Sequence, residues 1–120
     1  TKVQMYADGF MYYTPEKFVK GSTEDKHNIT TGYVDRKIYE ENPLTHKDFR
    51  KYLDSERELN QIEKYLVSDG VKLSDYVFKE IGNLMYNVFS VYENVLATKA
   101  RGVNFQLYGV DVAIDENLKL

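Results

Sequence analysis

The sequence predicts an α+β fold, in which an antiparallel sheet carries helices packed on one face. Three observations predict it. Alternating apolar residues mark strands near both ends of the chain, at 2–13 and at 104–114. Two long stretches between them, 45–68 and 74–101, carry apolar residues at helical spacing. Because strands and helices are segregated along the chain, helices on one face of an antiparallel sheet are the expected arrangement.

The first strands form a predicted hairpin. Residues 2–6 alternate, the turn signal Ala-Asp-Gly follows at 7–9, and residues 10–13 return as a second strand. A polar, glycine-containing loop at 20–26 separates this hairpin from a further β-prone segment at 28–35. The N-terminal third of the chain is therefore expected to supply strands and loops.

The first predicted helix begins near Thr45, whose side chain can cap it while Asp48 favours the N-terminal dipole. Its apolar stripe continues to Leu66, although the charged Glu56 interrupts it. The Ser-Asp-Gly sequence at 68–70 ends this helix.

The second predicted helix begins near Ser74 and stops before Gly102, which suits the C-terminal end of a helix. Few charged residues occur between Val77 and Val91. This composition predicts the buried helix of the domain, packed across the sheet that includes residues 104–114.

The last stretch sets one carboxylate, Asp111, within an apolar strand. Alternation places on one face Tyr108, Val110, Val112 and Ile114, and on the other Phe105, Leu107, Gly109, Asp111 and Ala113. Both faces are mostly apolar, which predicts a central strand covered on both sides. A buried aspartate must be hydrogen-bonded, charge-paired or metal-bound, since an unpaired buried carboxylate is costly. Residues 115–117 then form a hairpin turn.

Composition narrows the classes of function. The chain has 120 residues, which suits one modest domain, and its net charge of −3 argues against a general nucleic-acid binder. Without cysteine, neither a disulfide framework nor a cysteine-based zinc site is possible, which fits an intracellular compartment. No apolar run is long enough to predict a membrane span. The first residues lack a starting Met and a signal-peptide pattern, so they are not expected to be the native terminus.

Asp111 is the strongest candidate for a functional residue. A carboxylate on a central strand is a good ligand for Mg²⁺, which usually takes one or two carboxylates together with phosphate oxygens. Two alternatives to a metal ligand remain open from the sequence pattern. Asp111 could pair with a Lys or Arg side chain, or its strand could lie at the edge of the sheet.

Short polar side chains at Asn28, Thr30 and Thr31 could contact a phosphate or a nucleotide ribose. The alternative is that they are turn and strand-edge residues. The histidines, His27 and His46, have no ligand-like partner at a useful spacing and are interpreted as solvated.

Residues 105–119 carry a resemblance to a known family. The segment reads Phe-Gln-Leu-Tyr-Gly-Val-Asp, three apolar residues and then Asp-Glu-Asn-Leu-Lys. It resembles the closing segment of the tubulin–tyrosine ligase-like family, which reads Phe-Glu/Gln-Leu-Phe-Gly-x-Asp, a few apolar residues and Asp-Glu-x-Leu-Lys. Residues 2–13 are similar to the strand–turn–strand of that family, and residues 28–37 to its His-Leu-Thr-Asn segment.

The resemblance implies an ATP-grasp fold, of which residues 1–120 would be the C-terminal portion, a fragment lacking upstream and downstream segments. It implies ATP and Mg²⁺ as cofactors and an acyl-phosphate route that joins a carboxylate to an amine. The implied partners are a free amino acid (glutamate, glycine or tyrosine) and the tail of tubulin or of another protein with an acidic tail, without nucleic acid or membrane. Such an enzyme belongs in the cytoplasm, at the cytoskeleton or in a cilium, and its products include polyglutamylated microtubules.

Residue by residue, the resemblance makes Asp111 a magnesium ligand and places Thr30 and Thr31 near the nucleotide. It implies no catalytic side chain in this stretch. Three positions depart from the family pattern. Asn28 stands where the family has His, Thr31 where it has Asn, and Tyr12 where it has an Arg that handles negative charge, which a phenol cannot do. Tyr12 and Thr31 favour an alternative, in which the chain is a catalytically inactive relative that acts as a protein or microtubule interaction module.

Overall fold

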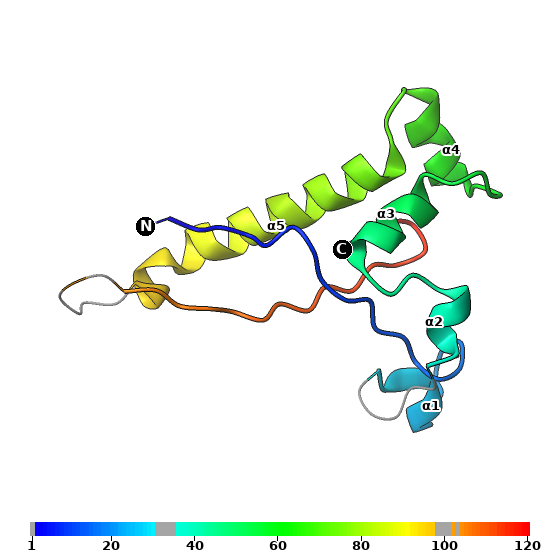
Figure 1. Ribbon diagram of the computed structural model, residues 1–120, viewed down its shortest axis with the longest axis horizontal. Helices are drawn as coiled ribbons and strands as arrows, with labels where there is room; N and C mark the ends of the chain where they lie inside the picture. Colours follow the sequence, from blue (N-terminus) through cyan, green and yellow to red (C-terminus); the bar gives the residue numbers. More distant parts are fainter. Residues whose placement is uncertain (1, 31–35, 98–101, 103) are drawn as a thin grey trace. The chain divides into compact units, whose positions relative to one another are not determined.

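The computed structural model describes residues 2–30, 36–97, 102 and 104–120. Figure 1 shows the helices of this described part in chain order, which are α1 (Asp25–Asn28), α2 (Ile38–Glu41), α3 (His46–Leu53), α4 (Gln61–Ser68) and α5 (Leu73–Leu96). The chain divides into two compact units. The N-terminal unit is Tyr6–Ser55, and the C-terminal unit is Thr1–Met5 with Glu56–Leu120.

The predicted antiparallel sheet is not confirmed, because the described residues contain helices, turns and irregular segments but no β-strand longer than a single bridge. The predicted hairpin between residues 2–6 and 10–13 is also not formed, and the boundary between the two units falls within its first strand. Alternation identifies a segment that can be extended. It does not specify which backbone groups pair with it, and that choice is made by distant residues.

Residues 9–11 pair instead with the N-terminal end of α3. Phe10 and Thr45 form an isolated antiparallel bridge. Next to it, the Met11 N–H donates to the Leu44 carbonyl oxygen at 2.9 Å. Further along, the Tyr13 hydroxyl donates to the carbonyl oxygen of Pro43 at 2.8 Å. The first segment of the N-terminal unit is therefore held against the connector that leads into α3.

The N-terminal end of α3 is as predicted. Thr45 and Asp48 form a capping box, in which the Asp48 N–H donates to Thr45 Oγ1 at 3.2 Å and the Thr45 N–H donates to Asp48 Oδ2 at 3.3 Å. These contacts satisfy backbone donors that the first turn of a helix leaves without partners.

The single helix predicted over 45–68 is in fact two helices, α3 and α4, and its break falls at the boundary between the units. Asn60 starts α4 with a second capping box. The Glu63 N–H donates to Asn60 Oδ1, and the Asn60 N–H donates to Glu63 Oε2, both at 2.9 Å. An asparagine side chain can accept a hydrogen bond from the free backbone N–H groups at a helix start, whereas asparagine is disfavoured inside a helix. Asn60 therefore begins a new helix.

The predicted end of this helical region is confirmed at 68–70. Gly70 adopts a positive φ of 76°, and its N–H donates to the Val67 carbonyl oxygen at 2.9 Å. The Val71 N–H donates to the Leu66 carbonyl oxygen at 3.2 Å. This pair of bonds is a Schellman motif, and it turns the chain from α4 into α5, against which α4 packs.

The prediction that the second helix is the buried helix is wrong for most of its length. Buried side chains in α5 are Leu73, Ser74 and Val77, all in the first two turns. Towards its C-terminal end apolar side chains are exposed, and Val95 is 79% exposed. A lack of charge permits burial but does not supply the surface that covers the helix. No helix of the described residues is long and apolar enough to cross a membrane.

Residues 104–120 return along α5 in the opposite direction (Figure 1). Tyr108 and Val110 lie against the C-terminal half of α5, and residues 117–120 lie beside its N-terminal half. The side chain of Leu118 is buried, as are those of Leu73 and Val77 at the start of α5. The C-terminal unit is thus a long helix with a second segment that runs back over one of its faces.

Candidate functional site

The returning segment presents two different faces, as its alternation predicts. The face toward α5 carries Tyr108 and Val110, and Val112 and Ile114, which share this face by alternation, are half-buried. The other face is open, with Phe105 91% exposed and Leu107 93% exposed. Asp111 belongs to this open face and is exposed. The prediction of a strand covered on both sides is therefore wrong, because within the C-terminal unit α5 covers one side only.

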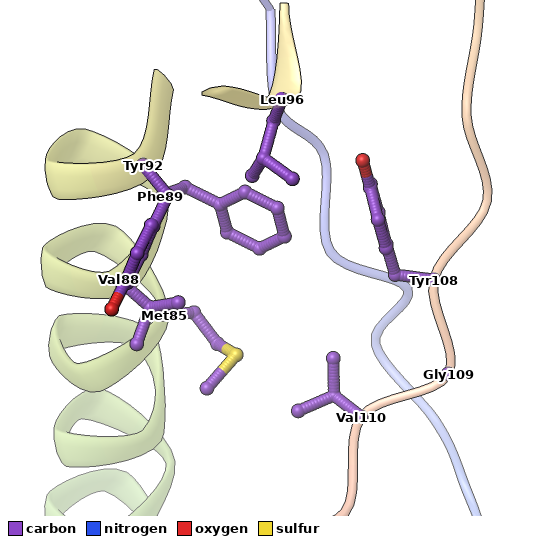
Figure 2. A pocket seen from close by; sticks show the side chains of 8 residues that line it. All are labelled: Met85, Val88, Phe89, Tyr92, Leu96, Tyr108, Gly109 and Val110. Atoms are coloured by element: carbon purple, nitrogen blue, oxygen red, sulfur yellow. The ribbon is translucent and has the colours of Figure 1, made fainter. Parts of the chain in front are cut away.

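The covered face lines an apolar groove beside α5. Figure 2 shows the side chains of α5 directed toward Tyr108 and Val110 across this groove, whose volume is about 330 Å³. The rings of Phe89 and Tyr108 meet edge to face, with centroids 5.6 Å apart and planes at 62°. The other lining residues are Met85, Val88, Tyr92, Leu96 and Gly109. This lining is mainly hydrocarbon, so the groove offers apolar contacts to the segment. Polar chemistry is available on the open face of the segment.

The Asp111 carboxylate makes no hydrogen bond or ion pair with any residue that the structure describes. The sequence-based alternative, a Lys or Arg partner, therefore finds no support in that part of the chain. Within the same part, no three His, Cys, Asp or Glu side chains gather into a site that could hold a metal ion. A single exposed carboxylate still fits Mg²⁺, which is bound by one or two carboxylates plus phosphate oxygens rather than by an all-protein cage. Asp111 as a metal ligand remains a prediction.

The neighbouring carboxylate, Asp115, has a structural role, and the turn predicted at 115–117 is confirmed. Asp115 Oδ1 accepts from the Asn117 N–H at 2.8 Å and from the Lys119 N–H at 2.9 Å. The Leu118 N–H donates to the Asp115 carbonyl oxygen at 3.0 Å. The backbone N–H groups of Lys119 and Asn117 lower the pKa of Asp115 below its usual value. Of these two aspartates, Asp115 uses its Oδ1 in the turn, whereas neither oxygen of Asp111 has a partner among the described residues.

A second anchor fixes the far end of the segment. The Asn60 side chain donates from Nδ2 to the carbonyl oxygen of Glu116 at 2.8 Å. Asn60 is also the N-cap of α4, so the same side chain starts a helix and holds the turn. Asp111 therefore lies between the aromatic contact at Tyr108 and the tethered turn at 115–119.

Thr30 and Thr31, the predicted nucleotide-contacting residues, follow α1. Thr30 is half-buried in the N-terminal unit, while Thr31 lies outside the described residues. Thr30 comes directly after Ile29, whose N–H ends α1 by donating to the Asp25 carbonyl oxygen at 2.8 Å. Because Asp111 belongs to the other unit, Thr30 and Asp111 are described separately, and the role of Thr30 and Thr31 toward a nucleotide stays a prediction.

Asn28 is the last residue of α1, so the β-segment predicted from this position is wrong at its first residue. Its side chain donates from Nδ2 to the carbonyl oxygens of Ser22 and Glu24, both at 2.9 Å. These bonds close the loop that precedes α1. The side chain at this position is consequently engaged in local structure.

The structure also reveals a polar network that sequence reasoning missed. The His27 side chain is only 11% exposed, so its interpretation as solvated is wrong. His27 Nδ1 lies 2.8 Å from Ser22 Oγ, and His27 Nε2 lies 3.2 Å from Glu16 Oε2. Hydrogen bonds from Lys26, and secondly from His27, lower the pKa of Glu16. Glu16 and Ser22 lie in the irregular segment before α1, so no helical or strand pattern signalled these contacts.

His46, the other histidine interpreted as solvated, is half-buried beside Gly9. The His46 N–H donates to the Gly9 carbonyl oxygen at 3.1 Å. A Cβ atom at Gly9 would lie 2.6 Å from His46 Cε1, which is closer than two carbon atoms can approach. The glycine of the Asp-Gly turn signal is therefore needed for a close approach between two segments of the N-terminal unit.

Tyr12 is 59% exposed, and its phenol occupies the position where the resemblance leads one to expect a guanidinium group. The adjacent Tyr13 points elsewhere, since its hydroxyl is bonded to Pro43. A phenol offers one hydroxyl and no positive charge. Any stabilisation of negative charge at this position would have to come from another residue.

Comparison with known proteins gives one match. The model of the tubulin-tyrosine ligase family matches residues 1–120. No curated protein and no solved structure is significantly similar to the chain. The family is one of ligases, and membership implies an ATP-grasp-like fold. Because the family model matches all 120 residues, the chain belongs to the tubulin-tyrosine ligase family.

Proposed function

We propose that the chain is part of an ATP- and Mg²⁺-dependent ligase that adds glutamate, glycine or tyrosine to a protein substrate. The substrate would be a tail of tubulin, or another protein with an acidic tail. The observation that carries this proposal is the exposed Asp111 carboxylate, which lies on the open face of the segment that carries the family motif. The family match over residues 1–120 supplies the reaction class.

In the proposed reaction, a carboxylate oxygen takes the terminal phosphoryl group of ATP, which gives an acyl phosphate and ADP. The nitrogen of the amine then attacks the carbonyl carbon. An amide bond forms, the bond to phosphate breaks, and the amine loses a proton. The magnesium ion would neutralise phosphate charge. Asp111 would hold that ion, while Thr30 and Thr31 would contact the nucleotide, so these residues contribute positioning and electrostatics.

Two features of the C-terminal unit support the assignment to Asp111. The apolar contact between Phe89 and Tyr108 and the Asn60 tether hold the segment on both sides of this residue. Its carboxylate is exposed and has no described partner, whereas Asp115 Oδ1 accepts two backbone N–H groups. A segment anchored on both sides of an accessible oxygen ligand suits a metal site, because the anchors help to orient the ligand before the ion binds.

The substrate also gives the expected location and partners. An enzyme that modifies tubulin tails would work in the cytoplasm, at the cytoskeleton or in a cilium. Its partners would be the target protein, ATP and a free amino acid, with no role for nucleic acid or membrane. The net charge of −3 agrees with the first of these exclusions, since nucleic-acid binders usually carry a basic surface.

A second function is favoured by Tyr12. Its exposed phenol stands where the family pattern has an arginine, and a phenol cannot replace a guanidinium in handling the negative charge of the reaction centre. We therefore keep as the alternative a catalytically inactive relative that serves as a protein or microtubule interaction module. The two functions differ in one measurable respect, which is the ATP-dependent formation of an amide bond.

The test is incorporation of labelled amino acids by the full-length protein. It is incubated with ATP, Mg²⁺, microtubules and, separately, labelled glutamate, glycine or tyrosine. Incorporation of one label, lost in Asp111→Asn and kept in the matched control Asp115→Asn, would establish the ligase and name its amino acid. Absence of incorporation together with absence of Mg²⁺-dependent ATP binding would favour the inactive relative.

A further inference from the structure

We propose that His27 is a positioning residue for the nucleotide, which acts by fixing α1 and so the place of Thr30. This inference rests on the proposed function, since it takes Thr30 to lie near the nucleotide. His27 is not expected to touch the nucleotide or the reacting atoms. Its effect is transmitted to Thr30 through the backbone of residues 28–30.

The first step of the argument is that His27 joins two parts of the chain. It lies in α1, and its ring reaches Ser22 Oγ in the preceding loop and Glu16 Oε2 eleven residues upstream. The side chain is only 11% exposed, so water has little access to the ring. A helix of four residues is not stable alone, so its position depends on contacts of this kind.

The second step is that the ring contacts hold in both charge states of the imidazole. In the neutral form, Nε2–H can donate to Glu16 while the Ser22 hydroxyl donates to Nδ1. In the cationic form, both ring N–H groups donate, to Glu16 and to Ser22. Ser22 Oγ also accepts the Glu24 N–H at 3.2 Å. Both ring contacts are therefore open to either form of the imidazole.

The third step is that the other bonds of this loop converge on the same short stretch. The Glu16 N–H donates to the Lys26 carbonyl oxygen at 3.0 Å, and Lys26 Nζ lies 3.2 Å from Glu16 Oε2. The Lys26–Glu16 ion pair is at the surface, with side chains 44% and 56% exposed, where ion pairs contribute little. His27 is the side chain of this set that is shielded from water. It is thus the contact whose removal should loosen α1 most.

The fourth step leads to Thr30. Ile29 closes α1 through its N–H, and Thr30 follows it directly. A displacement of α1 must therefore move Thr30, because one residue separates the helix from it. A hydroxyl that is to meet a phosphate or a ribose gains from being held in place beforehand, since ordering it on binding would cost affinity.

The experiment compares variants of the full-length protein by Mg·ATP titration and by steady-state kinetics. His27→Ala removes both ring contacts, whereas His27→Gln keeps a donor that can reach Glu16. Glu24→Gln is the matched control, because Glu24 belongs to the same loop and its carboxylate pairs with the exposed Lys26, at 3.3 Å. For His27→Ala we expect about a tenfold rise in the Kd and KM for ATP, with kcat changed less than about twofold. His27→Gln should restore much of the affinity, and Glu24→Gln should match the parent protein.

Hydrogen exchange supplies a readout that does not depend on ATP. The amides of Glu16 and Ile29, which close the loop and α1, should exchange faster in His27→Ala and return toward parental rates in His27→Gln. Faster exchange with an unchanged Kd for ATP would overturn the inference while leaving the proposed function intact. An equal loss of kcat and stability without rescue by glutamine would also overturn it, since that is a purely structural effect. If the parent protein itself failed to bind Mg·ATP, the proposed function and this inference would both fall.

Discussion

Arg57 and Glu63 form a two-pronged ion pair at the start of α4, with Nη2 2.6 Å from Oε1 and Nη1 3.0 Å from Oε2. Their side chains are 18% and 6% exposed. Glu63 Oε2 also accepts the Asn60 N–H, so one carboxylate serves the ion pair and the capping box together. Because Asn60 in turn holds the 115–119 turn, this pair helps to fix the segment that carries Asp111.

Replacement of Glu63 by Ala should destabilise the C-terminal unit strongly. It leaves the Arg57 guanidinium without its carboxylate in a poorly hydrated place, and breaking such a buried pair costs about 3–5 kcal/mol. The free energy of unfolding, measured with urea, tests this. Glu56→Ala, a change at an exposed residue next to Arg57, is the control and should fall within about 0.5 kcal/mol of the parent protein. A small effect at Glu63 would mean that water reaches the pair.

The same pair predicts a dependence of stability on pH. Hydrogen bonding from Arg57, the largest cause, lowers the pKa of Glu63 below its usual value of 4.5. A lowered folded-state pKa stabilises the fold above the unfolded pKa, and this contribution is lost as the pH falls through the folded pKa. The difference in melting temperature between the parent protein and Glu63→Gln should therefore be full at pH 6–7 and shrink below about pH 4.5. A difference that stays constant down to pH 3 would contradict the assignment.

Gly9→Ala should destabilise the N-terminal unit, because the new Cβ would lie 2.6 Å from His46 Cε1. Either the imidazole or the 9–11 segment must move, at a cost of about 1–3 kcal/mol. The double variant Gly9→Ala, His46→Ala tests the cause. If the clash is responsible, the two changes should be non-additive, with the second recovering part of the loss. Additive losses would place the cost of Gly9→Ala in the backbone.

The Tyr13 phenol should ionise only at high pH in the folded protein. Partial burial, followed by the nearby phenols of Tyr39 and Tyr52, raises its pKa to about 12. A raised folded-state pKa gives a contribution to stability that is complete below the unfolded pKa near 10 and is lost as the pH rises toward 12. Absorbance titration of the phenolates should lose a component at high pH in Tyr13→Phe. Persistence of that component in the variant would assign it to another tyrosine.

The features that were predicted correctly from sequence are those that depend on neighbours in the chain. The Thr45 cap of α3 and the Ser-Asp-Gly stop at 68–70 each lie within a few residues, and so does the turn at 115–117. The alternation of the segment that carries Asp111 was also correct, because it is a local property of the backbone. Local chemistry alone determines each of these features.

The features that sequence reasoning missed depend on which distant segments meet. Alternation marks residues 2–13 as able to extend, but the pairing of Phe10 with Thr45 spans 35 residues and has no local signature. The anchoring of His27 by Glu16 is likewise invisible to periodicity. The same limit applies to the segment that carries Asp111. Its sequence shows two apolar faces, but it does not show which face α5 covers.

The most direct test of the central claim is Mg²⁺-dependent ATP turnover by the full-length protein and its Asp111→Asn variant, with Asp115→Asn as the control. If Asp111 holds the magnesium ion, Asp111→Asn should abolish turnover while the melting temperature of the metal-free protein stays unchanged or rises, because an exposed carboxylate without a described partner contributes little to stability. Asp115→Asn keeps an oxygen that can accept from the turn, and it should retain turnover. Full turnover in Asp111→Asn would contradict the claim, and a large fall in melting temperature with activity retained would show that Asp111 is a structural residue.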